Sequence, residues 1–149
     1  MSRSTGMPSP ASGSLGYSIK LLQHALRLQI DDAIRPLGIT LPQFAVLVAV
    51  DSDPGISNAS LARAAFVTPQ SMQGIVANLE RDGLLKRRAD PHHGRILRSE
   101  LTRRGRGVFE QARSLVGAIE AKMTTSLDGD EVDQLSVLLR RCVSGLLQD

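Results

Sequence analysis

Residues 57–101 limit the possible folds most strongly, because they predict a short helix, a tight turn, an amphipathic helix and a β-hairpin in that order. Ser57 or Asn58 can cap the short helix. Thr68 followed by Pro69 is a typical start for the second helix, since a hydroxyl can cap a free backbone amide and proline suits the first helical turn. Apolar residues then follow at helical spacing: Met72, Ile75, Val76 and Leu79.

Two strand-like segments come next, at residues 84–88 and 95–101, and the residues between them include the turn formers Asp90, Pro91 and Gly94. The chain carries a net charge of only +3, but residues 81–106 contain nine basic and three acidic side chains. Such a local excess is typical of a surface that binds a polyanion. A solvated basic surface without a partner would have the same charge, so charge alone leaves both interpretations open.

Long amphipathic helices are predicted on both sides of this region. Residues 15–37 carry two apolar strips at helical spacing, which indicates two buried contacts: one with the core and one with a partner subunit. A helix beginning near Pro42 has a predicted buried face of Phe44, Leu47 and Val48, which can extend to Val50. The last helix begins with the capping-box pair Asp128 and Glu131 and carries the apolar stripe Val132, Leu135, Leu138, Leu139, Cys142, Val143 and Leu146.

These elements predict a mainly α fold with a small β-hairpin wing, of the α+β class. We expect a winged helix-turn-helix lobe at about residues 40–101, attached to dimerisation helices at about 15–37 and 102–147. Residues 1–14 are rich in Ser, Gly and Pro and are predicted to form a flexible tail, whereas residues 15–149 are predicted to form a single domain.

Composition narrows the class of protein. No apolar segment is long enough to cross a bilayer or resembles a secretion signal, so we expect a cytoplasmic protein without membrane contact. Cys142 is the one cysteine, and its place in an apolar stripe predicts a buried core thiol. Phosphate-binding glycine loops and the HExxH and GxSxG motifs are missing, which argues against an enzyme and gives no indication of a cofactor.

The second helix of the predicted helix-turn-helix has a polar face suited to reading base edges. Gln and Asn can bond adenine, Ser is permissive, and Gly allows close approach to the floor of the major groove. An ordinary solvent-exposed face would have the same composition, so the helix by itself does not decide. The candidate base-contacting residues are Thr68, Gln70, Ser71, Gln73, Gly74 and Asn78.

The basic hairpin strengthens the nucleic-acid interpretation. A wing of this charge can lie along the phosphates and insert an arginine into the minor groove, and Arg95 is the candidate for the tip. Arg88, His93 and Arg98 are further candidates for backbone contacts. A metal site is not expected, because adjacent histidine side chains diverge and no third ligand clusters with them.

These residues resemble the MarR-type (multiple antibiotic resistance) regulators from about residue 18 to residue 147. The similarity lies in LPQFAVLVAV, in SLARAAFVTPQSMQGIVANLERDGLLKRRADPHHGR, and in the LTRRG that follows the wing. The resemblance implies a homodimer that binds a pseudo-palindromic operator in double-stranded DNA. It also implies a repressor that is released by a small, often aromatic ligand in a crevice beside the dimer helices, where His24 and Phe44 are the candidate lining residues.

Two positions depart from the family pattern. The family commonly has Asp where this chain has His93, so we expect the wing to be more mobile or its order to depend on pH. In the second helix of the helix-turn-helix, two positions that are often basic in the family are occupied by Gly74 and Asn78 here. The electrostatic attraction to DNA is therefore expected to come mainly from the wing. A winged helix used only for protein contacts remains the main alternative function, although such a wing has no need of so many uncompensated charges.

Overall fold

The computed structural model describes residues 13–148 and is mainly helical with one small sheet, which confirms the predicted fold class. Residues 1–12 of the predicted tail lie outside the described residues, and Ser14 is the N-cap of the first helix. The helices are α1 (Leu15–Ile34), η1 (Arg35–Leu37), α2 (Leu41–Ser52), α3 (Asn58–Ala64), α4 (Pro69–Arg81), α5 (Arg103–Met123) and α6 (Gly129–Leu147). The strands are β1 (Ile56–Ser57), β2 (Leu85–Ala89) and β3 (Leu97–Leu101).

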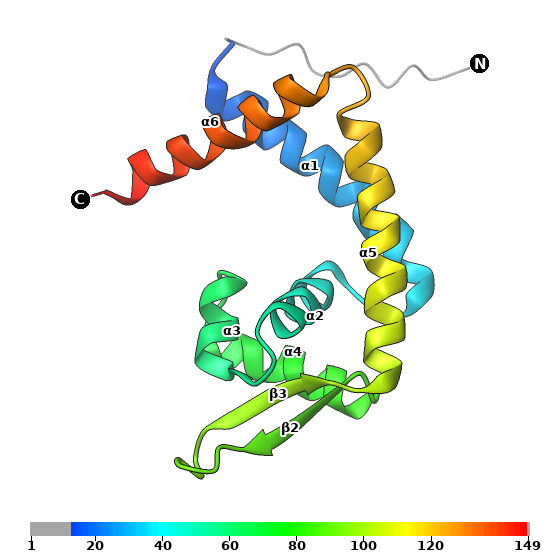
Figure 1. Cartoon of the computed structure of the whole chain (residues 1–149), viewed down its shortest axis with the longest axis vertical. Coiled ribbons are helices and arrows are strands. Elements are labelled where there is room, and N and C mark those ends of the chain that lie inside the picture. The colour runs from blue at the N-terminus through cyan, green and yellow to red at the C-terminus, as the bar shows by residue number, and fades with distance from the viewer. Residues whose placement is uncertain (1–12, 149) are drawn as a thin grey trace.

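A compact lobe of α2, α3, α4 and the sheet lies at one end of the molecule, and α5 leads away from it toward α6 (Figure 1). The lobe has an aliphatic core in which Leu47, Leu61, Met72 and Leu79 are almost completely buried. Burying each of these side chains contributes about 2 kcal/mol to the stability of the lobe. It provides the rigid base on which α4 and the hairpin are presented.

Side-chain caps define the helices much as the sequence predicts. The Ser57 hydroxyl accepts a hydrogen bond from the Ser60 amide, which makes Ser57 rather than Asn58 the cap of α3. After α3 the chain turns through Phe66, a non-glycine residue with φ of +56°, and the Phe66 and Val67 amides bond back to Arg63 and Ala62 in a Schellman pattern. The Phe66 side chain is 97% exposed.

The hairpin is part of a three-stranded sheet rather than an isolated pair, which the sequence analysis did not predict. β1 pairs with β3, with Ile56 opposite Ser99, and the strand order is β1-β3-β2. A strand of two residues has no detectable alternation, so only the pairing with β3 reveals it. This third strand attaches the wing to the segment that follows α2.

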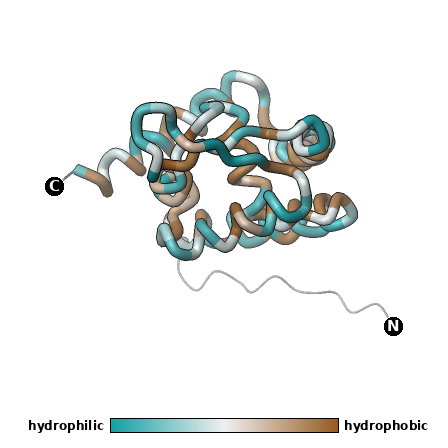
Figure 2. Tube along the Cα trace, turned by 90° about the horizontal axis from the view of Figure 1, so that it is seen from below, coloured by the Kyte–Doolittle hydropathy of each residue, from teal (hydrophilic) through white to brown (hydrophobic). Residues whose placement is uncertain are grey.

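Two predictions of burial were wrong. Val48 is 39% exposed, and Val46 occupies the buried position in α2 instead, because the core contacts this helix on the side of Leu47 and Val50. Cys142 is exposed, because α6, all of which the structure describes, has no buried residue and does not pack on the core of its own chain. Apolar and polar residues alternate along α6 where it projects from the rest of the molecule (Figure 2).

By length and apolarity, no single helix among residues 13–148 could cross a membrane. The segment Leu15–Leu37 together with Leu41–Ser52 passes the same test only as a pair bent by 80°.

Candidate nucleic-acid interface

The outer face of α4 is polar because its inner face is anchored in the core. Met72, Val76 and Leu79 are fully buried. The Thr68 hydroxyl accepts from the Ser71 amide at 3.1 Å and donates to the Ser71 hydroxyl at 3.0 Å, so these two candidates partly satisfy each other. The remaining four candidates are exposed and make no side-chain hydrogen bond to another described residue: Gln70, Gln73, Gly74 and Asn78.

The turn of the wing is held together by the Asp90 carboxylate. Asp90 Oδ1 accepts from the backbone amides of His92 at 2.8 Å and His93 at 3.0 Å, and Oδ2 accepts from Arg98 Nε at 2.8 Å. Arg98 Nη2 also lies 2.7 Å from this oxygen. The turn is therefore supported although position 93 carries a histidine instead of an aspartate, because the Asp90 carboxylate accepts hydrogen bonds from the His92 and His93 amides.

Hydrogen bonds from the His92 amide and the Arg98 side chain hold the pKa of Asp90 below its ordinary value of 3.8. Because folding lowers the pKa of Asp90, its carboxylate stabilises the turn fully above pH 3.8. This stabilisation is lost only as the pH falls through the lower pKa that Asp90 has in the folded protein. We therefore expect the His92 and His93 amides to stay ordered from neutral pH down to pH 3.8 and to become mobile only as the pH falls further, through the lower folded pKa of Asp90. NMR relaxation of these two amides against pH measures this.

The matched control for this titration is Asp90→Asn, in which the acid-induced loss of order should be absent. Loss of order well above pH 3.8, or the same acid-induced loss in Asp90→Asn, would contradict the expectation.

Most basic side chains of the wing region are already paired with acids. Six of the nine between residues 81 and 106 lie within 4.0 Å of a carboxylate: Arg81, Lys86, Arg87, Arg88, Arg98 and Arg106. Arg88 lies 3.6 Å from Glu100, and Arg98 is bound to Asp90. Among the described residues, Arg95, Arg103 and Arg104 have no acidic partner. Arg95 is therefore the free cation of the turn, beside the exposed His93.

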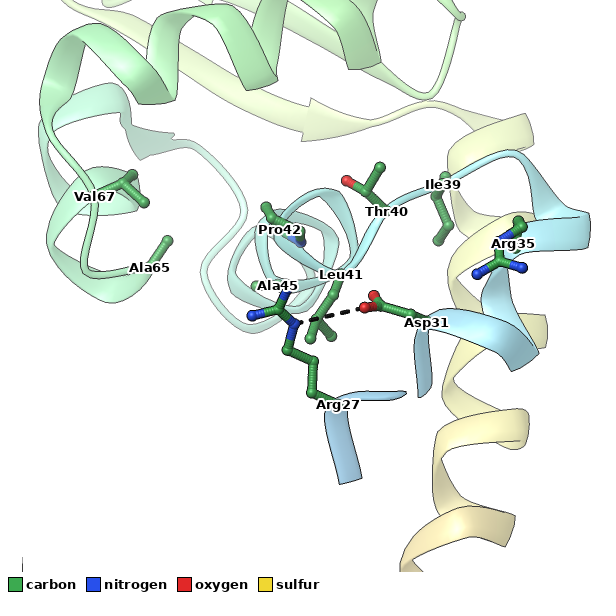
Figure 3. Close-up of a pocket in the computed structure, with 10 residues that line it drawn as sticks. All are labelled: Arg27, Asp31, Arg35, Ile39, Thr40, Leu41, Pro42, Ala45, Ala65 and Val67. Atoms are coloured by element: carbon green, nitrogen blue, oxygen red, sulfur yellow. Dashed lines mark ion pairs between the residues drawn. The ribbon is translucent and has the colours of Figure 1, made fainter. Parts of the chain in front are cut away.

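A cavity of about 730 Å³ lies between α1, the N-terminal turn of α2 and the turn that follows α3 (Figure 3). Its charged wall comes from α1 and η1, where Arg27 lies 3.6 Å from Asp31 and Arg35 faces the same space. Thr40 lines it beside an apolar wall made of Ile39, Leu41, Pro42, Ala45, Ala65 and Val67. Arg35 is also paired with Asp32 at 2.9 Å. The cavity thus combines an apolar surface with two guanidinium groups, each of which lies beside an aspartate.

The two residues predicted to line an effector crevice do not line this cavity. His24 is exposed on α1, and Phe44 is buried in the core, where its ring stacks on Phe109 with centroids 6.3 Å apart. Arg27 and Arg35 are not recognisable as cavity residues in the sequence, because their meeting with residues 65 and 67 depends on how α1 packs beside the lobe. The role of Asp90 was not predicted either, although an Asp two residues before a turn amide is a recognisable local signal.

Comparison with known proteins identifies the family. The model of the MarR family matches residues 37–96. The HTH-type transcriptional repressor Rv2887 of Mycobacterium tuberculosis is 36% identical over 127 residues, which cover 85% of this chain and 91% of the relative. This chain belongs to the MarR family.

Solved structures of MarR-family proteins have the same fold. Rv2887 in complex with salicylic acid has a TM-score of 0.71 at 35% identity, with 89% of this chain and 98% of that chain covered. A mutant of MarR from Escherichia coli, complexed with operator DNA, has a TM-score of 0.78 at 27% identity, with 86% and 92% covered. This MarR-family chain therefore spans nearly the full length of its relatives.

Proposed function

We propose that this chain is a transcription regulator that binds specific sequences in double-stranded DNA as a homodimer, and that it acts as a repressor in the cytoplasm. The observation that carries the proposal is the exposed polar face of α4 beside a fully described wing turn whose one unpaired cation is Arg95. Rv2887 is a repressor that has been solved with DNA, and the MarR mutant is bound to operator DNA, which supports the same activity here. A winged helix used only for protein contacts would not need an unpaired arginine at the tip.

In this proposal α4 lies in the major groove, and the wing reaches the neighbouring minor groove. Gln70, Gln73 and Asn78 are free to bond base edges, and Gly74 lets the helix approach the groove closely. Thr68 and Ser71 contribute chiefly by fixing the start of the helix. Two such lobes in a dimer would contact half-sites about 34 Å apart.

Replacing Arg95 with alanine tests the phosphate contact at the wing. We expect affinity for every duplex to fall about tenfold at moderate salt, and the slope of log K against log salt to become shallower by about 0.9, because one phosphate contact is lost. Fluorescence anisotropy over a salt series measures both quantities. Arg113→Ala, an exposed site in the middle of α5, is the control and should leave the slope unchanged. An unchanged slope in the Arg95 variant would contradict the wing assignment.

Gln73→Ala tests base reading. We expect discrimination between the preferred site and a site with one changed base pair to fall by about 1 to 3 kcal/mol, while affinity for unrelated DNA stays within about twofold. Competition binding against a library of duplexes measures the change in preference. Identical discrimination by the variant and the unmodified protein would exclude Gln73 as a base-contacting residue.

We also propose that the cavity beside α1 binds a small aromatic carboxylate that releases the DNA. Arg27 and Arg35 are suited to the carboxylate and the apolar wall to the ring, because guanidinium groups bind carboxylates through paired hydrogen bonds. Rv2887 has been solved with salicylic acid and with p-aminosalicylic acid, so salicylate is a suitable probe. Calorimetry with Arg27→Met should show at least fivefold weaker salicylate binding than the unmodified protein.

A further inference from the structure

Arg98 is bonded in two directions at once. Toward the tip of the wing, its Nε and Nη2 atoms bind the Asp90 carboxylate at 2.8 and 2.7 Å. Toward the lobe, its Nη1 donates to the Gly55 carbonyl oxygen at 3.2 Å. The guanidinium group therefore joins the turn of the wing to the segment between α2 and β1.

That segment is held firmly in place. The Gly55 amide donates to the Ser99 carbonyl oxygen at 2.9 Å, so Gly55 is bonded to β3 through its backbone as well as through Arg98. In the last turn of α2, Asp51 pairs with Arg106 of α5 at 3.0 Å. The C-terminal end of α2 thus contacts both the root of the wing and the start of α5.

The opposite end of α2 forms a wall of the cavity through Leu41, Pro42 and Ala45. A helix of 12 residues is about 18 Å long and moves nearly as a rigid unit, because its backbone groups are bonded to one another. A displacement of α2 at the cavity end would therefore be passed on to the segment after it, which contains Gly55. From Gly55 the bonded path continues through Arg98 to Asp90 and the two amides of the turn.

We infer that Arg98 is a positioning residue that couples the cavity to the wing: it sets the place of Arg95 according to the position of α2, and it does not bind phosphate itself. The inference rests on the proposed DNA-binding function and on the proposed ligand site. Bonding favours this role over a phosphate contact, because three of the five guanidinium donors are occupied and the side chain is only 41% exposed. A phosphate could bind both Nε and Nη2 of Arg98 only by displacing the Asp90 carboxylate, which holds the turn of the wing together.

Arg98→Lys tests the inference, because lysine keeps the charge but its single ammonium cannot join Asp90 and Gly55 in the same way. We expect DNA affinity to fall about tenfold in Arg98→Lys and by a similar factor in Arg98→Met. In a double-mutant cycle, adding Arg95→Ala to Arg98→Lys should produce little further loss, since Arg98 acts through Arg95. Asp90→Asn removes the ion pair with Arg98 by changing its acidic partner, so it should cause the same loss of DNA affinity. Arg113→Lys is the control, because Arg113 is exposed in the middle of α5 away from the wing, and it should change affinity less than twofold.

The second readout is the effect of salicylate on DNA binding. In the unmodified protein we expect saturating salicylate to weaken DNA binding at least fivefold. In Arg98→Lys this factor should fall below twofold, while the salicylate affinity of the free protein and its thermal unfolding stay unchanged. A purely structural role of Arg98 would not remove the coupling while leaving both of those quantities intact.

Three outcomes would overturn the inference. Full DNA affinity in Arg98→Lys with a loss in Arg98→Met would show a phosphate contact that needs only charge. Additive losses in the double-mutant cycle would show that Arg98 and Arg95 act separately. An unchanged salicylate factor in Arg98→Lys would show that the cavity acts on DNA binding by another route. Failure of the unmodified protein to bind DNA or salicylate would instead refute the proposed function itself, and the inference with it.

Discussion

Replacing Gly105 with alanine is expected to destabilise the fold by about 3 kcal/mol or more, because the new methyl group has no room. A Cβ at this position would lie 1.9 Å from the Leu84 carbonyl oxygen and 2.8 Å from its carbonyl carbon. Both are backbone atoms that cannot rotate away, and the same oxygen accepts a hydrogen bond from the Thr102 amide at 3.1 Å. The start of α5 would have to move away from the segment that joins α4 to β2.

Urea unfolding followed by circular dichroism measures this loss, and Gly107→Ala is the matched control. Gly107 lies in the same helix with nothing within 4 Å of the built Cβ, so alanine there should stabilise the protein by up to about 1 kcal/mol. Equal stabilities of the two variants would show that α5 does not approach Leu84 as closely as the structure has it.

Leu139→Asp is expected to convert the protein to a monomer at micromolar concentration and to weaken operator binding at least a hundredfold, because the two half-sites are then bound independently. Over its whole described length α6 has no buried residue in the single chain, yet it exposes large apolar side chains: Leu135, Leu138, Leu139, Val143 and Leu146. An apolar surface of this kind marks a protein interface, and a charge placed in it would be buried without a partner. Light scattering measures the mass, and anisotropy measures the binding.

Ser144→Asp is the control for this experiment. Ser144 lies on the opposite face of α6 from Leu139 by helical geometry, so the same charge there should leave a dimer that binds DNA normally. A dimeric Leu139→Asp variant would show that α6 is not part of the subunit interface.

Local sequence signals were enough to predict the helices and their caps. Asp128 and Glu131 form the predicted capping box, with each side chain bonded to the backbone amide of the other at 2.9 Å. The Thr68 hydroxyl caps α4 as expected, and the Thr102 hydroxyl caps α5 in the same way. These predictions succeeded because capping and helical periodicity depend on residues three or four positions apart, whose geometry is the same in every helix.

The candidate site was predicted in part, for the same reason. The exposed face of α4 and the exposed Arg95 follow from periodicity and turn composition alone. Sequence cannot say which cations are already paired, and so it grouped Arg98 and Arg88 with Arg95. It also cannot show that the Phe44 ring stacks on Phe109 in the core.

What the sequence by itself determined is the order of the elements, the mainly helical class with its small wing, and the polar and basic faces that lie on adjacent elements. Only the tertiary structure decided that β1 joins the sheet, that Arg98 links Asp90 to Gly55, that Gly105 must lack a side chain, and that the α6 stripe is left uncovered by its own chain. The physical reason is range: Gly55 and Arg98 are 43 positions apart, and such pairs meet only when the packing of the lobe brings them together.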